Sequence, residues 1–204
     1  MVSCNAFDVL AQIVEVNPSI EGLTLVSYME KLNWRDLTQS QGLAELDALI
    51  VGTQQDRGER ALRKIVRTEA TAARLRCVAE ELPKEQLLGV FSKVSLVDGG
   101  TAHIPMMDFS CVPSDRNLEL LKSLLKSLGG GKGFLLESGK SYHYYGTQIL
   151  DEEGWRIFLG KCLLMSDHSD SRYIGHQLID GHCVLRLSAG KLKQMLPKLV
   201  TVVV

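Results

Sequence analysis

The chain has 204 residues, of which 45% are hydrophobic and 23% charged, and its formal net charge at pH 7 is −1. This composition is typical of a globular protein with one sizeable core, and the near-neutral charge argues against a protein that coats nucleic acid nonspecifically. No apolar run reaches 18 residues and the N-terminus lacks a basic leader region, so neither a membrane span nor a signal peptide is expected.

The five cysteines are odd in number and widely spaced, and no two of them form a Cys-x-x-Cys pair. Neither a disulfide framework nor a structural zinc site is therefore expected, and a reducing, cytoplasmic location is the default. All five histidines lie in the second half of the chain, which points to that half for any chemistry. They are His103, His143, His168, His176 and His182.

Residues 1–86 are predicted to form a mainly helical N-terminal subdomain. Apolar residues at helical spacing run up to Asn17-Pro18, and residues 23–32 and 43–51 continue that periodicity. The segment 59–82 is rich in Ala, Arg, Leu and Glu and has no Gly or Pro, so it is predicted to be helical too. Its basic residues could form a basic face, but a solvated face with Glu partners is the commoner arrangement.

From residue 87 onward, strands alternate with helices, and residues 87–204 are predicted to form an α+β domain. Asp98-Gly99-Gly100-Thr101 is a strong hairpin signal, Ser114 is a plausible helix N-cap, and the triple glycine after residue 128 ends that helix. The expected strands are 90–97, 103–109, 133–137, 142–149, 184–187 and 199–204; the expected helices are 114–128, one starting at Asp151, and 188–196.

A polar turn between two of these strands carries the strongest chemical signal. Ser138-Gly139-Lys140-Ser141 offers a flexible glycine, two hydroxyls, an ammonium and backbone N–H groups, which suit phosphate. His143 follows two residues later, on the strand face opposite to Tyr142 and Tyr144. A nucleotide triphosphate pocket and an ordinary hairpin with packed tyrosines have equal weight on this segment alone.

The second half resembles the archaeo-eukaryotic primase superfamily, in particular its small bacterial primase-like members. The resemblance covers roughly residues 90–200, and it rests on a strand with a carboxylate, a helix, a Ser-x-His hairpin, a second helix and a basic strand, in that order. It implies an RRM-like sheet with flanking helices. In active members, acidic residues hold two divalent metal ions for nucleotidyl transfer, while the histidine and nearby basic groups bind the incoming triphosphate.

The resemblance places Asp108 in the first acidic position, but Ser110 occupies the second, which removes one anionic metal ligand. Asp170 is the candidate for the third acid, with His176 or Asp180 as alternatives. The implied ligands of Mg²⁺ or Mn²⁺ are Asp108 and Asp170, and the implied catalytic residues are these two and His143. The implied nucleotide-binding residues are Ser138, Lys140, Ser141, His143, Arg172, His176 and Arg186.

Three functions remain open. The first is a primase or polymerase that uses NTP or dNTP, with single-stranded DNA or RNA as a further ligand. The second is a catalytically degenerate primase-fold subunit that senses nucleotides or binds a protein partner, which the serine at position 110 favours. The third, a metal-dependent nuclease that would use the same Asp and His residues, ranks lowest. If the resemblance holds, Asp108 and His143 should lie on neighbouring strands and open into one cleft, with the Ser138–Ser141 turn and Arg186 as its cationic wall.

Overall fold

The computed structural model describes residues 4–29, 60–127 and 131–204, together with residues 42, 44, 46, 47 and 50. Its α-helices are α1 (Ala6–Val16), α4 (Ala72–Glu80), α5 (Asp115–Ser127), α6 (Glu152–Leu163) and α7 (Ser171–Asp180). Its strands are β1 (Ile20–Met29), β2 (Arg60–Val66), β3 (Gln86–Phe91), β4 (Lys93–Leu96), β5 (Thr101–His103), β6 (Met106–Asp108), β7 (Gly133–Glu137), β8 (Tyr142–Gly146), β9 (Val184–Arg186) and β10 (Lys198–Val203).

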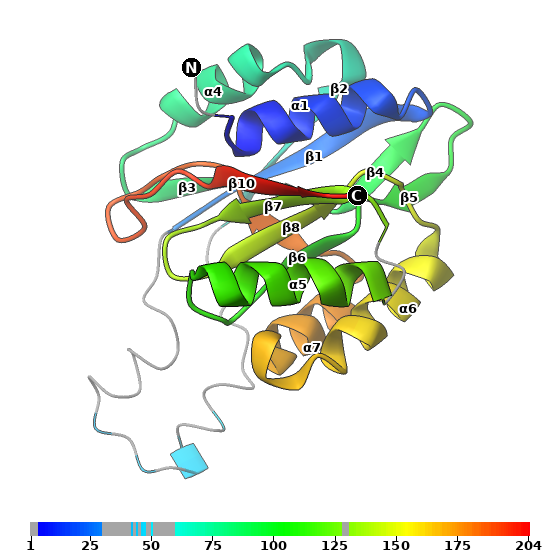
Figure 1. Cartoon of the computed structure of the whole chain (residues 1–204). Helices are drawn as coiled ribbons and strands as arrows, with labels where there is room; N and C mark the ends of the chain where they lie inside the picture. Colours follow the sequence, from blue (N-terminus) through cyan, green and yellow to red (C-terminus); the bar gives the residue numbers. More distant parts are fainter. Residues whose placement is uncertain are drawn as a thin grey trace.

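The strands form two sheets, and every pairing between described strands is antiparallel. The six-stranded sheet has the order β5-β4-β1-β3-β9, and its sixth strand, β2, pairs with the edge of β1 opposite to β3. The four-stranded sheet has the order β10-β7-β8-β6. Figure 1 shows α1 and α4 on one side of the molecule and α5, α6 and α7 on the other, with the strands between them. The fold is therefore α+β, as the sequence predicts.

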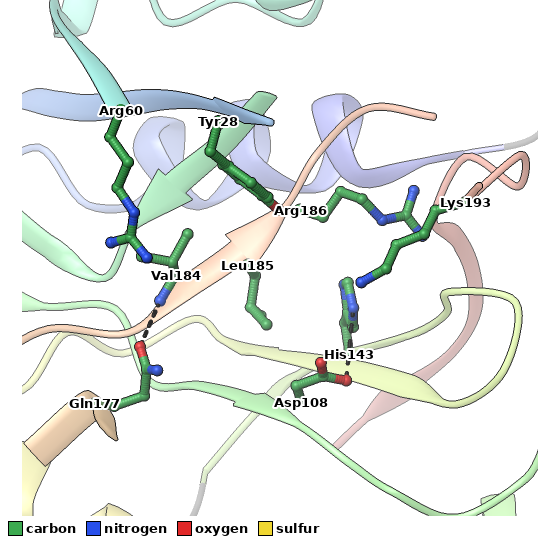
Figure 2. Close-up of a pocket in the computed structure, with 9 residues that line it drawn as sticks. All are labelled: Tyr28, Arg60, Asp108, His143, Gln177, Val184, Leu185, Arg186 and Lys193. Carbon is green, nitrogen blue, oxygen red and sulfur yellow. Dashed lines mark hydrogen bonds and ion pairs between the residues drawn. The ribbon is translucent and has the colours of Figure 1, made fainter. Parts of the chain in front are cut away.

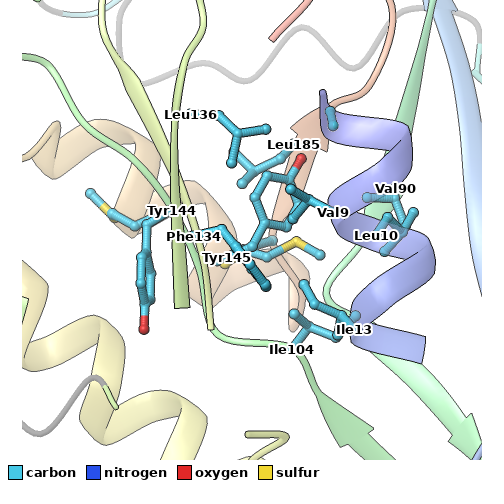
Figure 3. Packing of buried hydrophobic residues seen from close by; sticks show 14 of the residues in the cluster. Val9, Leu10, Ile13, Val90, Ile104, Phe134, Leu136, Tyr144, Tyr145 and Leu185 are labelled. Atoms are coloured by element: carbon cyan, nitrogen blue, oxygen red, sulfur yellow. The ribbon is translucent and has the colours of Figure 1, made fainter. Parts of the chain in front are cut away.

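One hydrophobic core joins the two sheets. The apolar face of α1 contributes Val9, Leu10 and Ile13, which are fully buried and belong to the same cluster as Phe134 and Tyr145 of the four-stranded sheet (Figure 3). The helix starts at a capping box, in which Asn5 accepts a hydrogen bond from the Phe7 N–H and Asp8 accepts one from the Asn5 N–H. The core thus fixes the relative position of strands β6 and β8 and of the strands of the other sheet.

The prediction of a mainly helical N-terminal part is wrong in two places. Residues 20–29 form β1, and residues 60–66 form β2, where helices were expected. Both segments have enough β-branched and apolar residues to pair, and strand partners distant in sequence override their local helical periodicity. The helix in the segment 59–82 is confined to α4, and the expectation for residues 43–51 falls largely outside the described residues.

The predicted boundary near residue 86 separates strands that are paired with each other, because β1 pairs with both β3 and β4. Three basic residues of this region have acidic partners, although residues 60–66 form a strand and not part of a helical face. Arg63 and Arg74 contact Glu81, and Arg76 contacts Asp8.

The predicted elements of the second half are mostly confirmed. The hairpin β4–β5, the helix capped by Ser114, strands β7 and β8, the helix capped by Asp151, and strands β9 and β10 are all present. The short helix predicted over 188–196 is wrong, because that segment follows β9 as an irregular loop. All five cysteines are free thiols, and no helix in the described part of the chain has the length and apolar character that a membrane crossing requires.

Candidate functional site

Asp108 and His143 lie opposite each other on paired strands. Asp108 ends β6 and is the register partner of His143 in β8. The Nε2 atom of His143 lies 3.7 Å from Oδ1 of Asp108, and Ser141 Oγ donates a hydrogen bond of 3.2 Å to the same oxygen. The expected placement of Asp108 and His143 on neighbouring strands is confirmed, and the polar turn reaches the same carboxylate through Ser141.

Asp108 and His143 line a pocket of about 220 Å³ between the two sheets. Its walls come from strands β1, β2 and β9 on one side, β6 and β8 on the other, helix α7, and the loop after β9. The lining residues are Tyr28, Arg60, Asp108, His143, Gln177, Val184, Leu185, Arg186 and Lys193 (Figure 2). Three cationic side chains and one carboxylate thus line the same pocket. The volume is below the roughly 300–1,000 Å³ of pockets that enclose a whole drug-sized ligand, so this pocket is too small to enclose a whole molecule of nucleotide size.

Arg186 connects the walls of the pocket. Its side chain is buried, with 4% exposure, and its guanidinium donates hydrogen bonds to the backbone carbonyls of Ser138, Ser188 and Met195. It therefore ties the polar turn before β8 to the loop after β9. The predicted cationic wall contains Arg186, but much of its hydrogen-bonding capacity holds the backbone in place.

The environment shifts the pKa values of Asp108 and His143 in opposite directions. Removal from bulk water raises the pKa of Asp108 to about 6. Lys193 and the Ser141 hydroxyl favour its charged form and oppose this rise, and 38% of the Asp108 side chain is exposed. Burial, with help from the charges of Arg186 and Lys193, holds the pKa of His143 well below its usual range. At neutral pH, a neutral imidazole therefore faces a largely ionised carboxylate. Nδ1 of His143 is buried and makes no hydrogen bond within the described protein.

The family model described as "AEP-like: Archaeo-eukaryotic primase 1D-like" matches residues 67–198, more than half of the chain. The chain belongs to this family. No curated protein and no solved structure matches the chain significantly. The matched primase-like segment contains Asp108, His143, Arg186 and Lys193, whereas Tyr28 and Arg60 of the pocket precede it.

Several residues assigned from the primase resemblance do not line the pocket. The side chain of Asp170 caps α7 by accepting hydrogen bonds from the N–H groups of Arg172 and Tyr173, although its charge is close enough to raise the pKa of Asp108. Lys140 is exposed in the turn, and Arg172 and His176 lie on α7, which presents Gln177 to the pocket instead. The roles predicted for these residues stay predictions.

A two-metal centre does not fit the donors of this primase-like site. In the described ranges, no group of three or more His, Cys, Asp and Glu side chains is placed to hold a metal ion. Among the residues that the structure describes, Asp108 is the one carboxylate that lines the pocket, and one oxygen of Asp170 already accepts two backbone hydrogen bonds. Ser110, in the second acidic position, is exposed, and its N–H donates to the carbonyl of His168.

Sequence reasoning missed four polar or aromatic residues of the pocket: Tyr28, Arg60, Gln177 and Lys193. The helical assignment of the N-terminal part hid the first two, since only the register of β2 against β1 places Arg60 beside Tyr28. A signal for Lys193 was present, because Lys191 and Lys193 follow the basic strand closely. Lys193 was predicted to lie in a helix over 188–196, and this prediction did not indicate that its side chain extends toward His143.

We expect the protein to lose stability as the pH falls from 7.5 to 5.5. Burial is the main cause that lowers the pKa values of His103, His143 and His182 in the folded state. The neutral imidazoles therefore leave the folded state at full stability above the unfolded pKa of about 6.5, and stability is lost as the pH falls below it. Asp108 has a raised pKa and opposes this loss below about pH 6. Urea unfolding at the two pH values measures the difference, and Asp108→Asn should make the loss larger. Equal stability at both pH values would contradict the prediction.

Proposed function

We propose that this primase-like domain binds a nucleotide through its phosphate groups. The observation that supports the proposal is the convergence of Arg60, Arg186 and Lys193 on one pocket around the Asp108–His143 pair. The chain has a net charge of −1, but three cationic side chains and one carboxylate line this pocket and give it a local positive charge. Arginine and lysine are the side chains that bind phosphate oxygens by charge-assisted hydrogen bonds.

The turn before β8 adds neutral donors near this pocket. The Ser141 hydroxyl lies against Asp108, and Gly139 has a φ of +110°, a backbone conformation that side-chain-bearing residues rarely adopt. The polar turn and the cations therefore meet at Asp108. The Ser141 hydroxyl donates to Asp108 and the Ser138 hydroxyl to the Ser141 carbonyl, so the cations are the main donors for a di- or triphosphate bound beside this turn.

We further propose that catalysis is slow or absent. Nucleotidyl transfer by two metal ions needs converging carboxylates, and in the described part of the chain Asp108 is the single carboxylate of the pocket. Mg²⁺ or Mn²⁺ carried by the nucleotide would meet Asp108 as its protein ligand, an arrangement in which substrate phosphates and water supply the other ligands. A nucleotide-sensing subunit, acting with a protein partner, is therefore favoured over an active primase.

Calorimetric titration with ATP and dATP, with and without Mn²⁺, tests the binding, and primer extension on a single-stranded template tests the activity. We expect saturable binding of nucleotides and no more than slow extension. Absence of binding to either nucleotide would refute the proposed function. Rapid extension that Asp108→Ala abolishes would instead establish a polymerase and refute the degenerate interpretation.

A further inference from the structure

The side chain of Tyr28 lines the pocket on the face of the six-stranded sheet. Tyr28 belongs to β1, and it pairs with Arg60 of β2 on one side and Leu87 of β3 on the other. A Cβ atom placed on Gly89 of β3 would lie 3.1 Å from Cε1 of Tyr28 and 3.1 Å from a methyl carbon of Val184 in β9. The ring therefore extends over Gly89 toward β9, in space that the glycine leaves open.

The cations of the pocket lie on both sides of this ring. In the order β2-β1-β3-β9, Arg60 is on one outer strand and Arg186 on the other, with Gly89 as the register partner of Arg186. Three strand spacings separate β2 from β9, which is about 14 Å between backbones. The Tyr28 ring lies between them, and Figure 2 shows its side chain extending from β1 toward Arg186.

We propose that Tyr28 is the platform on which the base of the bound nucleotide stacks. The inference rests on the proposed function. When the phosphates bind near Arg186, Lys193 and His143, the attached nucleoside lies over the neighbouring ring of Tyr28. The pocket is too small for a whole nucleotide, so the nucleoside leaves it past Tyr28 on the side of Arg60. Stacking on an aromatic side chain suits every base, because each has a π-face.

This platform belongs to the part of the chain that the primase-like match does not include, since the match begins at residue 67. Strands β1 and β2 therefore add the contact to the base, whereas the matched segment supplies most of the contacts to phosphate. The domain is expected to distinguish nucleotides from bare polyphosphate, with little preference among the four bases.

The test compares ATP with inorganic tripolyphosphate in the full chain, under identical Mg²⁺ concentrations. The wild type should bind ATP more tightly than tripolyphosphate. Tyr28→Leu keeps an apolar side chain over Gly89 but removes the aromatic face, and it should weaken ATP binding on the order of 10-fold while leaving tripolyphosphate binding unchanged. Tyr28→Phe is the matched control, and it should bind both ligands as the wild type does. Thermal unfolding of each variant verifies that the fold is retained.

The outcomes separate this inference from the proposed function. If Tyr28→Leu weakens the binding of ATP and of tripolyphosphate by the same factor, or changes neither, the stacking inference is overturned while phosphate binding stands. If the wild type binds neither ligand, both are overturned. Loss of the preference for ATP in Tyr28→Leu, and its retention in Tyr28→Phe, supports the platform.

Discussion

Replacing Arg186 with methionine is expected to lower the free energy of unfolding by about 3 kcal/mol or more. The guanidinium is buried and donates to three backbone carbonyls, those of Ser138, Ser188 and Met195, so the substitution removes the donor from one buried and two partly buried acceptors. Methionine keeps most of the apolar volume, which restricts the effect to the lost hydrogen bonds and charge. Urea unfolding of both proteins at pH 7.5 measures the difference.

Arg156→Met is the matched control for this prediction. Arg156 lies on α6 with 66% of its side chain exposed and pairs with Glu152, so its replacement should change stability by less than about 0.5 kcal/mol. Arg186→Lys should be intermediate, because lysine keeps the charge but not the planar fork that reaches three carbonyls. Equal effects of Arg186→Met and Arg156→Met would show that Arg186 does not hold the two loops together.

Replacing Lys193 with alanine is expected to weaken ATP binding about 10-fold, the scale of one charge-assisted hydrogen bond at a partly solvated position. Lys193 lines the pocket, and its charge acts on both Asp108 and His143. In Figure 2 its side chain extends toward His143. The binding of adenosine should not change, because adenosine has no phosphate for the ammonium to contact. Calorimetry with both ligands tests the prediction.

Lys191→Ala is the control for Lys193→Ala, because Lys191 is exposed in the same loop and is not among the residues that line the pocket. Its replacement removes the same net charge but should alter ATP affinity by less than about 2-fold, the scale of a screened surface charge. If the two variants lose the same affinity, Lys193 acts only through the general field of the protein. An equal loss for adenosine would mean that the pocket does not recognise phosphate there.

Local signals were sufficient for most of the second half of the chain. Ser114 and Asp151 cap helices because their side chains accept hydrogen bonds from N–H groups three residues later, a contact contained within a few residues. The turn at Asp98-Gly99-Gly100 forms because Gly99 adopts a positive φ and Asp98 accepts the Gly100 N–H. Such contacts need no distant partner, so a short window of sequence predicts them.

The same reasoning failed where distant pairing decides the structure. Residues 20–29 have apolar residues at spacings compatible with a helix, yet β1 is paired with β2, β3 and β4 and lies in the middle of a sheet. In residues 188–196, two carbonyl groups accept hydrogen bonds from Arg186, and the segment remains an irregular loop. In both cases, contacts with other parts of the fold outweigh local helical preference.

The candidate site divides in the same way. The sequence by itself determined that Asp108 lies in one strand, that His143 lies in another directly after a polar turn with Ser141, and that Ser110 replaces the second acid of the primase pattern. Only the tertiary structure brings Tyr28 and Arg60 to these residues, because their position depends on strand register across the six-stranded sheet. It also makes Asp170 a helix cap and directs Lys193 toward His143. Residue types and short-range spacing are properties of the chain, whereas a pocket between two sheets exists only after strands distant in sequence have paired.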